Sequence, residues 1–158
     1  MTTGTTQDPE AFVQSLSQPE VDFAIIADRV EVVNGKLYMM GGGYDRIFTQ
    51  EQMPYTFALS FAVGVLVPWN ACNQEHRLSF AVEDPEGNNL GLGATVGFNV
   101  GRPPGMGQGE TQRVMLAPPA AAVTFPDYGT YLLHVSLNGA ADKRVPLYVR
   151  SLLASKVG

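Results

Sequence analysis

The sequence predicts an all-β protein, an immunoglobulin-like antiparallel β-sandwich of about seven to nine strands with no disulfide. Several segments alternate large apolar residues with small or polar ones, above all residues 55–65 and 130–137. Turn sequences separate these segments, and no long stretch has helical periodicity. Because successive side chains of a strand point to opposite faces, such alternation indicates strands with one buried face.

The N-terminal half contains the clearest strand signals. Residues 23–27 are continuously apolar, which is typical of a strand buried on both faces. Two apolar runs, 30–33 and 36–40, flank Asn34-Gly35 and predict a hairpin, because both turn residues tolerate a positive φ. Residues 55–65 place Phe57 and Phe61 on one face and small residues on the other.

The C-terminal half continues the same pattern. Residues 77–83 and 90–100 alternate, and the acidic turn 84–88 lies between them. Shorter strands are expected within 111–117 and 121–125, and longer alternation returns in 130–137. Pro146 places the last strand, 145–149, at an edge or a bulge, since proline donates no ladder hydrogen bond. We expect Phe57, Phe61, Phe80 and Leu133 in the core.

One domain fits a chain of 158 residues. We expect a flexible N-terminal tail over 1–19, in which Asp8 caps a possible short helix, then the sandwich over 20–150 and a C-terminal tail over 151–158. Residues 101–110 are rich in glycine and proline and have no periodicity. We therefore expect them to form a mobile loop.

Composition excludes several classes of protein. A net charge of −5 with ten basic residues argues against nucleic acid as a partner. No apolar run approaches the length of a membrane helix, and the first residues lack the basic and apolar regions of a secretory signal. We therefore predict a cytoplasmic protein with no membrane partner. The single cysteine excludes an intrachain disulfide.

No motif supports catalysis, so we predict a protein that is not an enzyme and needs no cofactor or metal. Cys72 and His76 supply two ligands or a thiol with a base, but a zinc site needs three or four protein ligands. The turn that starts at Asp84 lacks the ligand spacing of an EF-hand loop. Glycines 41–43 precede Arg46 without the Lys-Ser/Thr and the helix of a phosphate loop.

The segment 127–131 reads Asp127-Tyr128-Gly129-Thr130-Tyr131. It resembles the tyrosine corner of immunoglobulin-like sandwiches, in which a buried tyrosine donates its hydroxyl to nearby backbone. Asp127, Gly129 and Tyr131 are the residues expected to form this corner. The disulfide of antibody-type domains is absent, because only Cys72 exists.

A second resemblance covers residues 21–150. The stretch from Asp22-Phe23-Ala24 through Asn34-Gly35-Lys36, together with the turn at residues 83–87 and the segment 125–131, is similar to a group of small bacterial proteins of unknown function. The resemblance implies one folded unit with a sandwich fold. It implies no activity, ligand or catalytic residue.

Two strands have unusually small faces. Ala58, Ser60, Ala62 and Gly64 form the first, where we expect cover from the chain itself. The second is rich in glycine and invites pairing with a partner. The candidate interaction residues are Gly91, Gly93, Thr95, Gly97, Arg102 and Met106. We predict a non-catalytic protein-interaction or assembly module, with a protein partner or self-association. The alternative is a sandwich that binds a small ligand or carbohydrate through exposed aromatic residues (Tyr44, Trp69, Tyr128 and Tyr148).

Overall fold

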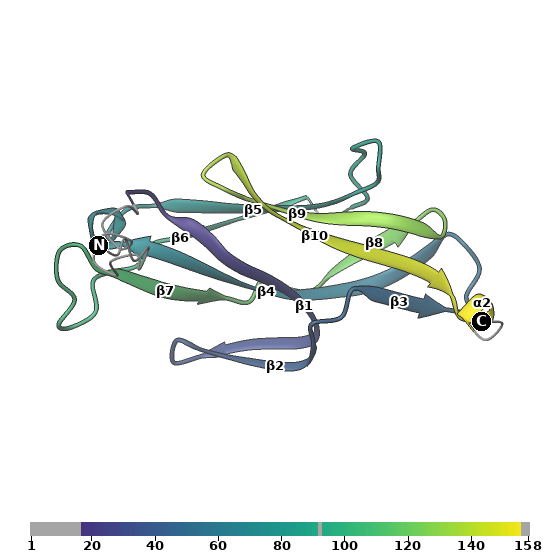
Figure 1. The fold of residues 1–158 in the computed structure, drawn as a ribbon, viewed down its shortest axis with the longest axis horizontal. Coiled ribbons are helices and arrows are strands. Elements are labelled where there is room, and N and C mark those ends of the chain that lie inside the picture. The colour runs from purple at the N-terminus through teal and green to yellow at the C-terminus, as the bar shows by residue number, and fades with distance from the viewer. Residues whose placement is uncertain (1–16, 92, 156–158) are drawn as a thin grey trace, which may run out of the picture.

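The computed structural model describes residues 17–91 and 93–155, so the predicted helix near Asp8 lies outside the described residues. Two β-sheets pack face to face, as Figure 1 shows. The strands are β1 (Glu20–Val33), β2 (Lys36–Gly42), β3 (Arg46–Thr49), β4 (Tyr55–Pro68), β5 (His76–Glu83), β6 (Ala94–Phe98), β7 (Thr111–Leu116), β8 (Ala121–Phe125), β9 (Gly129–Leu137) and β10 (Ala140–Ser151). Helical structure is confined in the described chain to the 3-10 turn η1 (Trp69–Ala71) and the short helix α2 (Leu152–Ser155).

Sheet one has the order β2-β1-β4-β7, and β8 also pairs with β4. The long strand β4 organises this sheet, because different parts of it pair with different neighbours. Tyr55–Leu59 pairs with β8, while the rest of β4 pairs with β1 and β7. The inward side chains of this sheet come from alternate residues of β4, as the sequence predicted for Leu59, Phe61, Val63 and Val65, and Val67 continues the same row.

Sheet two has the order β3-β10-β9-β5-β6. The short strand β3 runs parallel to β10, whereas all the other pairs are antiparallel. The predicted purely antiparallel sandwich of seven to nine strands is therefore wrong in two respects, since the described chain has ten strands and one sheet is mixed. Four residues, Arg46–Thr49, are too few to show a periodicity in the sequence.

The core fills the space between the sheets. Phe61 and Phe80 meet edge to face with ring centroids 4.9 Å apart, a favoured aromatic geometry. Leu133 is fully buried, as expected, while Phe57 is only half-buried near the end of the sandwich. Layers of aromatic and branched side chains from both sheets thus hold the fold together.

The tyrosine corner forms as predicted, although glycine is not needed in it. The Tyr131 hydroxyl donates a 2.6 Å hydrogen bond to the carbonyl of Asp127. Gly129 begins β9, its φ is not in the left-handed range, and a Cβ there would meet no atom within 4 Å. The buried tyrosine therefore fixes this corner, and Gly129 contributes no special backbone conformation.

Two strand predictions need different corrections. Residues 90–100 were expected to form one strand, but β6 covers only Ala94–Phe98, and Gly91 has a φ of 117° that ends regular pairing. Pro146 lies inside β10, which is an interior strand. Because β3 pairs only with Tyr148–Ser151, the part of β10 around Pro146 still has an open edge.

Candidate interaction surface

A hairpin projects from the body of the sandwich as a third layer. It consists of residues 28–42, the distal half of β1 and all of β2, which we call the flap. In Figure 1 the flap lies beneath sheet one, on the side opposite sheet two. Its turn has positive φ angles at Asn34 (51°) and Gly35 (72°), as a type I′ hairpin requires. The predicted hairpin is therefore present, but most of it is not part of the sandwich body.

The chain bends sharply at the root of the flap. Gly41 has a φ of 63°, and a Cβ at this position would collide with the carboxylate of Asp28. Both the conformation and the space therefore require glycine here. The Gly43 N–H donates to the carbonyl of Ile26, which ties the chain back to sheet one. The glycine run 41–43 thus shapes the root of the flap.

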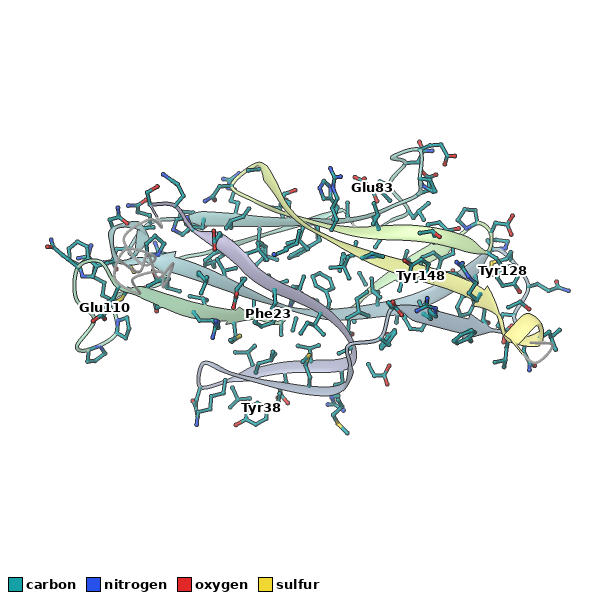
Figure 2. The ribbon with its side chains drawn as sticks, viewed as in Figure 1. Phe23, Tyr38, Glu83, Glu110, Tyr128 and Tyr148 are labelled. Atoms are coloured by element: carbon teal, nitrogen blue, oxygen red, sulfur yellow. The ribbon has the colours of Figure 1, made fainter. Side chains whose placement is uncertain are left out.

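The inner face of the flap covers part of sheet one. Val30 and Val32 pair with Met39 and Leu37, so these four side chains share one face. On the opposing surface Phe23 lies against Gly64, where a Cβ would collide with its ring. Figure 2 labels Phe23 on the side of the sheet that faces the flap. Ala62 and Gly64 are buried, which agrees with the expectation that the chain covers this small face, whereas Ala58 stays exposed.

The outer face of the flap presents apolar side chains to solvent. Tyr38 is 55% exposed and Met40 69%, and Figure 2 shows Tyr38 directed away from the body. Val33, 43% exposed, lies on the same face, and Met39 is 37% exposed although it belongs to the inner face. These four are the majority of the large apolar residues exposed in the described chain, the others being Phe48, Tyr128 and Leu153. Such a concentration marks an interaction site more often than scattered apolar residues do.

β2 is also an edge strand, because its partner in the sheet is β1 alone. In an antiparallel ladder closed by a two-residue turn, Val33 and Lys36 form a hydrogen-bonded pair, and alternate pairs follow. The main-chain groups of Leu37 and Met39 therefore point to the free edge. Lys36, at the start of the strand, is the one charged residue of β2. The strand lacks the proline and the multiple charges that commonly protect such edges.

The predicted interaction residues of the glycine strand lie at a different edge, that of sheet two. Thr95 and Gly97 are in β6, while Gly91 and Gly93 precede it. The Thr95 hydroxyl lies 3.1 Å from that of Ser79, and a side chain at Gly97 would collide with Glu75. Contacts within the chain therefore explain why Thr95 and Gly97 are small, without a partner.

Arg102 and Met106 belong to the loop that follows β6, and both make contacts within the chain. The Arg102 guanidinium stacks on the Trp69 ring, 3.2 Å from its centroid, and Nε donates to the Trp69 carbonyl. Met106 packs against the core, and the Trp69 N–H donates to Glu110. The loop therefore has three points of attachment that its composition did not reveal.

Cys72 and His76 are both buried and have structural partners. Cys72 accepts a 3.1 Å hydrogen bond from Gln112. The two His76 nitrogens lie 2.8 Å from the Ala71 carbonyl and 3.1 Å from the Asn138 amide. This geometry fits a neutral imidazole with the proton on Nε2. Within the described residues no group of three metal-ligating side chains occurs.

Asp84 organises its turn through hydrogen bonds within the turn. Its carboxylate accepts hydrogen bonds from the backbone of Glu86 and from the backbone and side chain of Asn88. These bonds, led by the one from the Asn88 side chain, lower the pKa of Asp84. The adjacent hollow of about 190 Å³ is lined by this turn and by the tyrosine corner, including Tyr128 and Tyr131.

The aromatic residues proposed for ligand binding have separate contacts. Trp69 is covered by Arg102, and Tyr148 lies between Arg46 and Arg150. The Tyr128 hydroxyl lies 3.4 Å from the carbonyl of Glu51. Tyr44 lines a hollow of about 250 Å³ at the root of the flap, and burial followed by the charge of Asp28 raises its pKa. No two of these four aromatic rings contact each other within the described part of the chain.

Sequence reasoning recognised the flap hairpin but not its projection from the sandwich with exposed apolar side chains. Residues 36–40 were interpreted as an ordinary strand, although their side chains give no polar face. In Leu37-Tyr38-Met39-Met40 both faces are apolar, a pattern that requires cover on both sides or leaves one side exposed. The two apolar faces could have been recognised in the sequence. The bend at Gly41, which directs the hairpin away from the sandwich, could not.

Comparisons with known proteins identify a family for this chain. No curated protein and no solved structure matches the chain significantly. None of the helices in the described part of the chain is long and apolar enough to span a membrane. A family model described as a family of unknown function, DUF6941, matches residues 22–150, nearly the whole of the two-sheet unit. The chain thus belongs to the DUF6941 family.

Proposed function

We propose that this protein is a non-catalytic interaction module that docks a protein partner on the flap. The observation that carries the proposal is the concentration of exposed apolar side chains, led by Tyr38 and Met40, on one projecting hairpin. A partner that covers this surface removes apolar area from water, at about 25 cal/mol per Å² before the costs of association.

The open edge of β2 supplies the second part of the proposal. A partner strand laid along this edge satisfies the main-chain groups of Leu37 and Met39, while Tyr38 and Met40 pack against its side chains. Recognition by added strands uses this combination of backbone hydrogen bonds and alternate side chains. An interaction of this kind needs no catalytic group and no cofactor.

The immunoglobulin-like attribution and the cellular context belong to the same proposal. The tyrosine corner supports an immunoglobulin-like ancestry, although the mixed sheet and the flap depart from the usual strand plan. The acidic composition supports a protein partner over nucleic acid. We propose a cytoplasmic location on the sequence features already given.

A pair of matched variants tests the proposal against the glycine-strand alternative. Tyr38→Ser combined with Met40→Ser removes the apolar surface of the flap, and Gly93→Arg places a bulky charge beside β6. We expect the first variant to lower the mass of the native complex in the producing cell while its melting temperature stays within a few degrees. Gly93→Arg should leave the complex intact. Loss of the complex in Gly93→Arg alone would contradict the choice of the flap and favour the β6 edge.

A further inference from the structure

We infer that the partner of the flap is a second copy of this chain, joined through antiparallel pairing of β2 with β2 of the partner. This inference rests on the proposed function, since it names the occupant of the same surface. A two-fold axis at Met39 pairs each Met39 with its counterpart. Because Met39 points its main-chain groups to the free edge, this central pair forms two hydrogen bonds.

The sequence of β2 is self-complementary in this register. Residues equally far from Met39 on its two sides pair across the axis. Tyr38 of each subunit therefore lies opposite Met40 of the partner subunit. These are closely spaced, non-hydrogen-bonded pairs, in which side chains pack best. An exposed aromatic ring thus meets an exposed thioether on each side of the axis.

Charges in the flap also suit a second copy. Lys36, the charged residue of β2, lies opposite Gly42 of the partner subunit, so no like charges face each other on the new pair of strands. Within each flap Glu31 pairs with Tyr38, and Arg29 pairs with Met40. Each row across the four strands therefore has an acid at one end, a base at the other, and the Tyr38–Met40 pair in the middle.

Assembly also remedies a weakness of the single chain. A two-stranded ribbon is marginally stable by itself, whereas three or more strands with an apolar face are stable. Pairing converts two projecting hairpins into one four-stranded sheet, and the Tyr38–Met40 pairs on the two sides of the axis form one apolar strip along its centre. The isologous symmetry closes the assembly at two copies, so the same edge cannot propagate into a fibre.

Cysteine cross-linking tests this register directly. In the proposed dimer the two residues at position 39 face each other with a Cα separation of about 5.5 Å, within the range for a disulfide. Met39→Cys should therefore yield a covalent dimer under mild oxidation. Lys36→Cys is the matched control, because its two copies lie about 20 Å apart in this register. Cys72 is buried and should not react in either variant.

Light scattering with purified full-length chain tests the assembly itself. We expect twice the 17.0 kDa monomer mass at high concentration, and dissociation on dilution. Met39→Pro removes the outward N–H, while Met39→Ala keeps it and removes a comparable side chain. We expect Met39→Pro to raise the dissociation constant at least about tenfold relative to Met39→Ala, with both monomers folded by circular dichroism.

Three results would overturn the inference. A monomer mass at every concentration up to several hundred micromolar excludes the second copy as partner. Equal dissociation constants for the two Met39 variants exclude edge pairing. Faster cross-linking of Lys36→Cys than of Met39→Cys excludes the register. The proposed function is tested independently of the dimer. It fails if the flap variants leave the native complex unchanged. If the complex depends on the flap but contains a different protein, the proposed function stands and the dimer is excluded.

Discussion

At the residue scale Tyr131 fixes the corner between β8 and β9. Its hydroxyl donates to Asp127, and its ring lies 4.9 Å from that of Phe125, centroid to centroid. Tyr131→Phe removes the hydrogen bond and keeps the ring, so we expect a loss of about 1 kcal/mol in the free energy of unfolding. Denaturant melts measure this loss. Unchanged stability would show that the bond contributes nothing to the corner.

The same residue gives a pH dependence with a definite sign. Burial, followed by the nearby charges of Asp127 and Asp84, raises the pKa of Tyr131 above its ordinary value of 10.0. The unfolded chain therefore ionises at lower pH than the folded chain. The stabilisation is complete below pH 10.0 and is lost as pH rises through the folded pKa. Tyr131→Phe should show a shallower alkaline loss.

Asp84 gives the opposite dependence at acid pH. Its lowered pKa means that the folded chain holds the ionised carboxylate better than the unfolded chain does. This stabilisation is present above the ordinary pKa of 3.8 and is lost as pH falls through the folded pKa. We expect Asp84→Asn to be less stable than the parent at pH 7, with the gap closing below about pH 3.8. A gap that is independent of pH would contradict this role for the charge.

The residues that could be predicted from sequence are those with local causes. Asn34 and Gly35 predict a turn, and the spacing of Asp127 and Tyr131 predicts a tyrosine corner. Both structures form within five consecutive residues, so a local sequence pattern reveals them. The contacts of Arg102 with Trp69 and of Gln112 with Cys72 join residues more than thirty positions apart. No local pattern reveals such pairs, and so the anchored loop was expected to be mobile.

At the element scale β1 and β4 approach each other closely at Phe23 and Gly64. Gly64→Ala forces the Phe23 ring to move, and we expect a cost of about 1–3 kcal/mol in denaturant melts. The cost should fall sharply in a Phe23→Ala background, which a double-mutant cycle measures. Gly129→Ala is a suitable control, because a Cβ there meets nothing within 4 Å. Additive effects of the two substitutions would refute the contact.

One of the three attachments of the loop after β6 is the stacked pair of Arg102 and Trp69. Arg102→Ala should release residues 103–110 and increase their amide hydrogen exchange, because the guanidinium no longer covers Trp69. Trp69 is the single tryptophan, so its fluorescence reports the same event. We expect a red shift in emission, with no shift in the control Arg77→Ala. Rapid exchange of the loop already in the unaltered chain would show that the stacked pair does not order it, and would agree with the prediction of a mobile loop.

At the scale of the whole molecule, sequence periodicity predicts the layers and not the connections. Alternation in β4, β5 and β9 correctly placed the core faces, because burial of one face is a property of each strand alone. The parallel pairing of β3 with β10 unites residues about a hundred positions apart. The departure of the flap from sheet one depends on the bend at Gly41, whose neighbours in space the sequence does not show.

The same limit applies to the candidate site. The glycine-rich sequence predicted an interaction site at the β6 edge, because a strand face of small residues lets another chain approach closely. In the structure a side chain at Gly97 would collide with Glu75, and the Thr95 hydroxyl lies within hydrogen-bond distance of that of Ser79. By contrast, Tyr38 and Met40 on the outer face of the flap are not covered by the described chain. Choosing between two edge strands requires the exposure of their side chains, which depends on tertiary packing.

The central claim is that the flap is the docking surface, and photo-cross-linking in the producing cell tests it most directly. Benzoylphenylalanine in place of Tyr38 puts the probe at the exposed face of the flap, and the same probe in place of Thr95 lies on the edge of the opposite sheet. The account predicts one dominant cross-linked product from position 38, of fixed mass, and none from position 95. A product from position 95 with none from position 38 would contradict it.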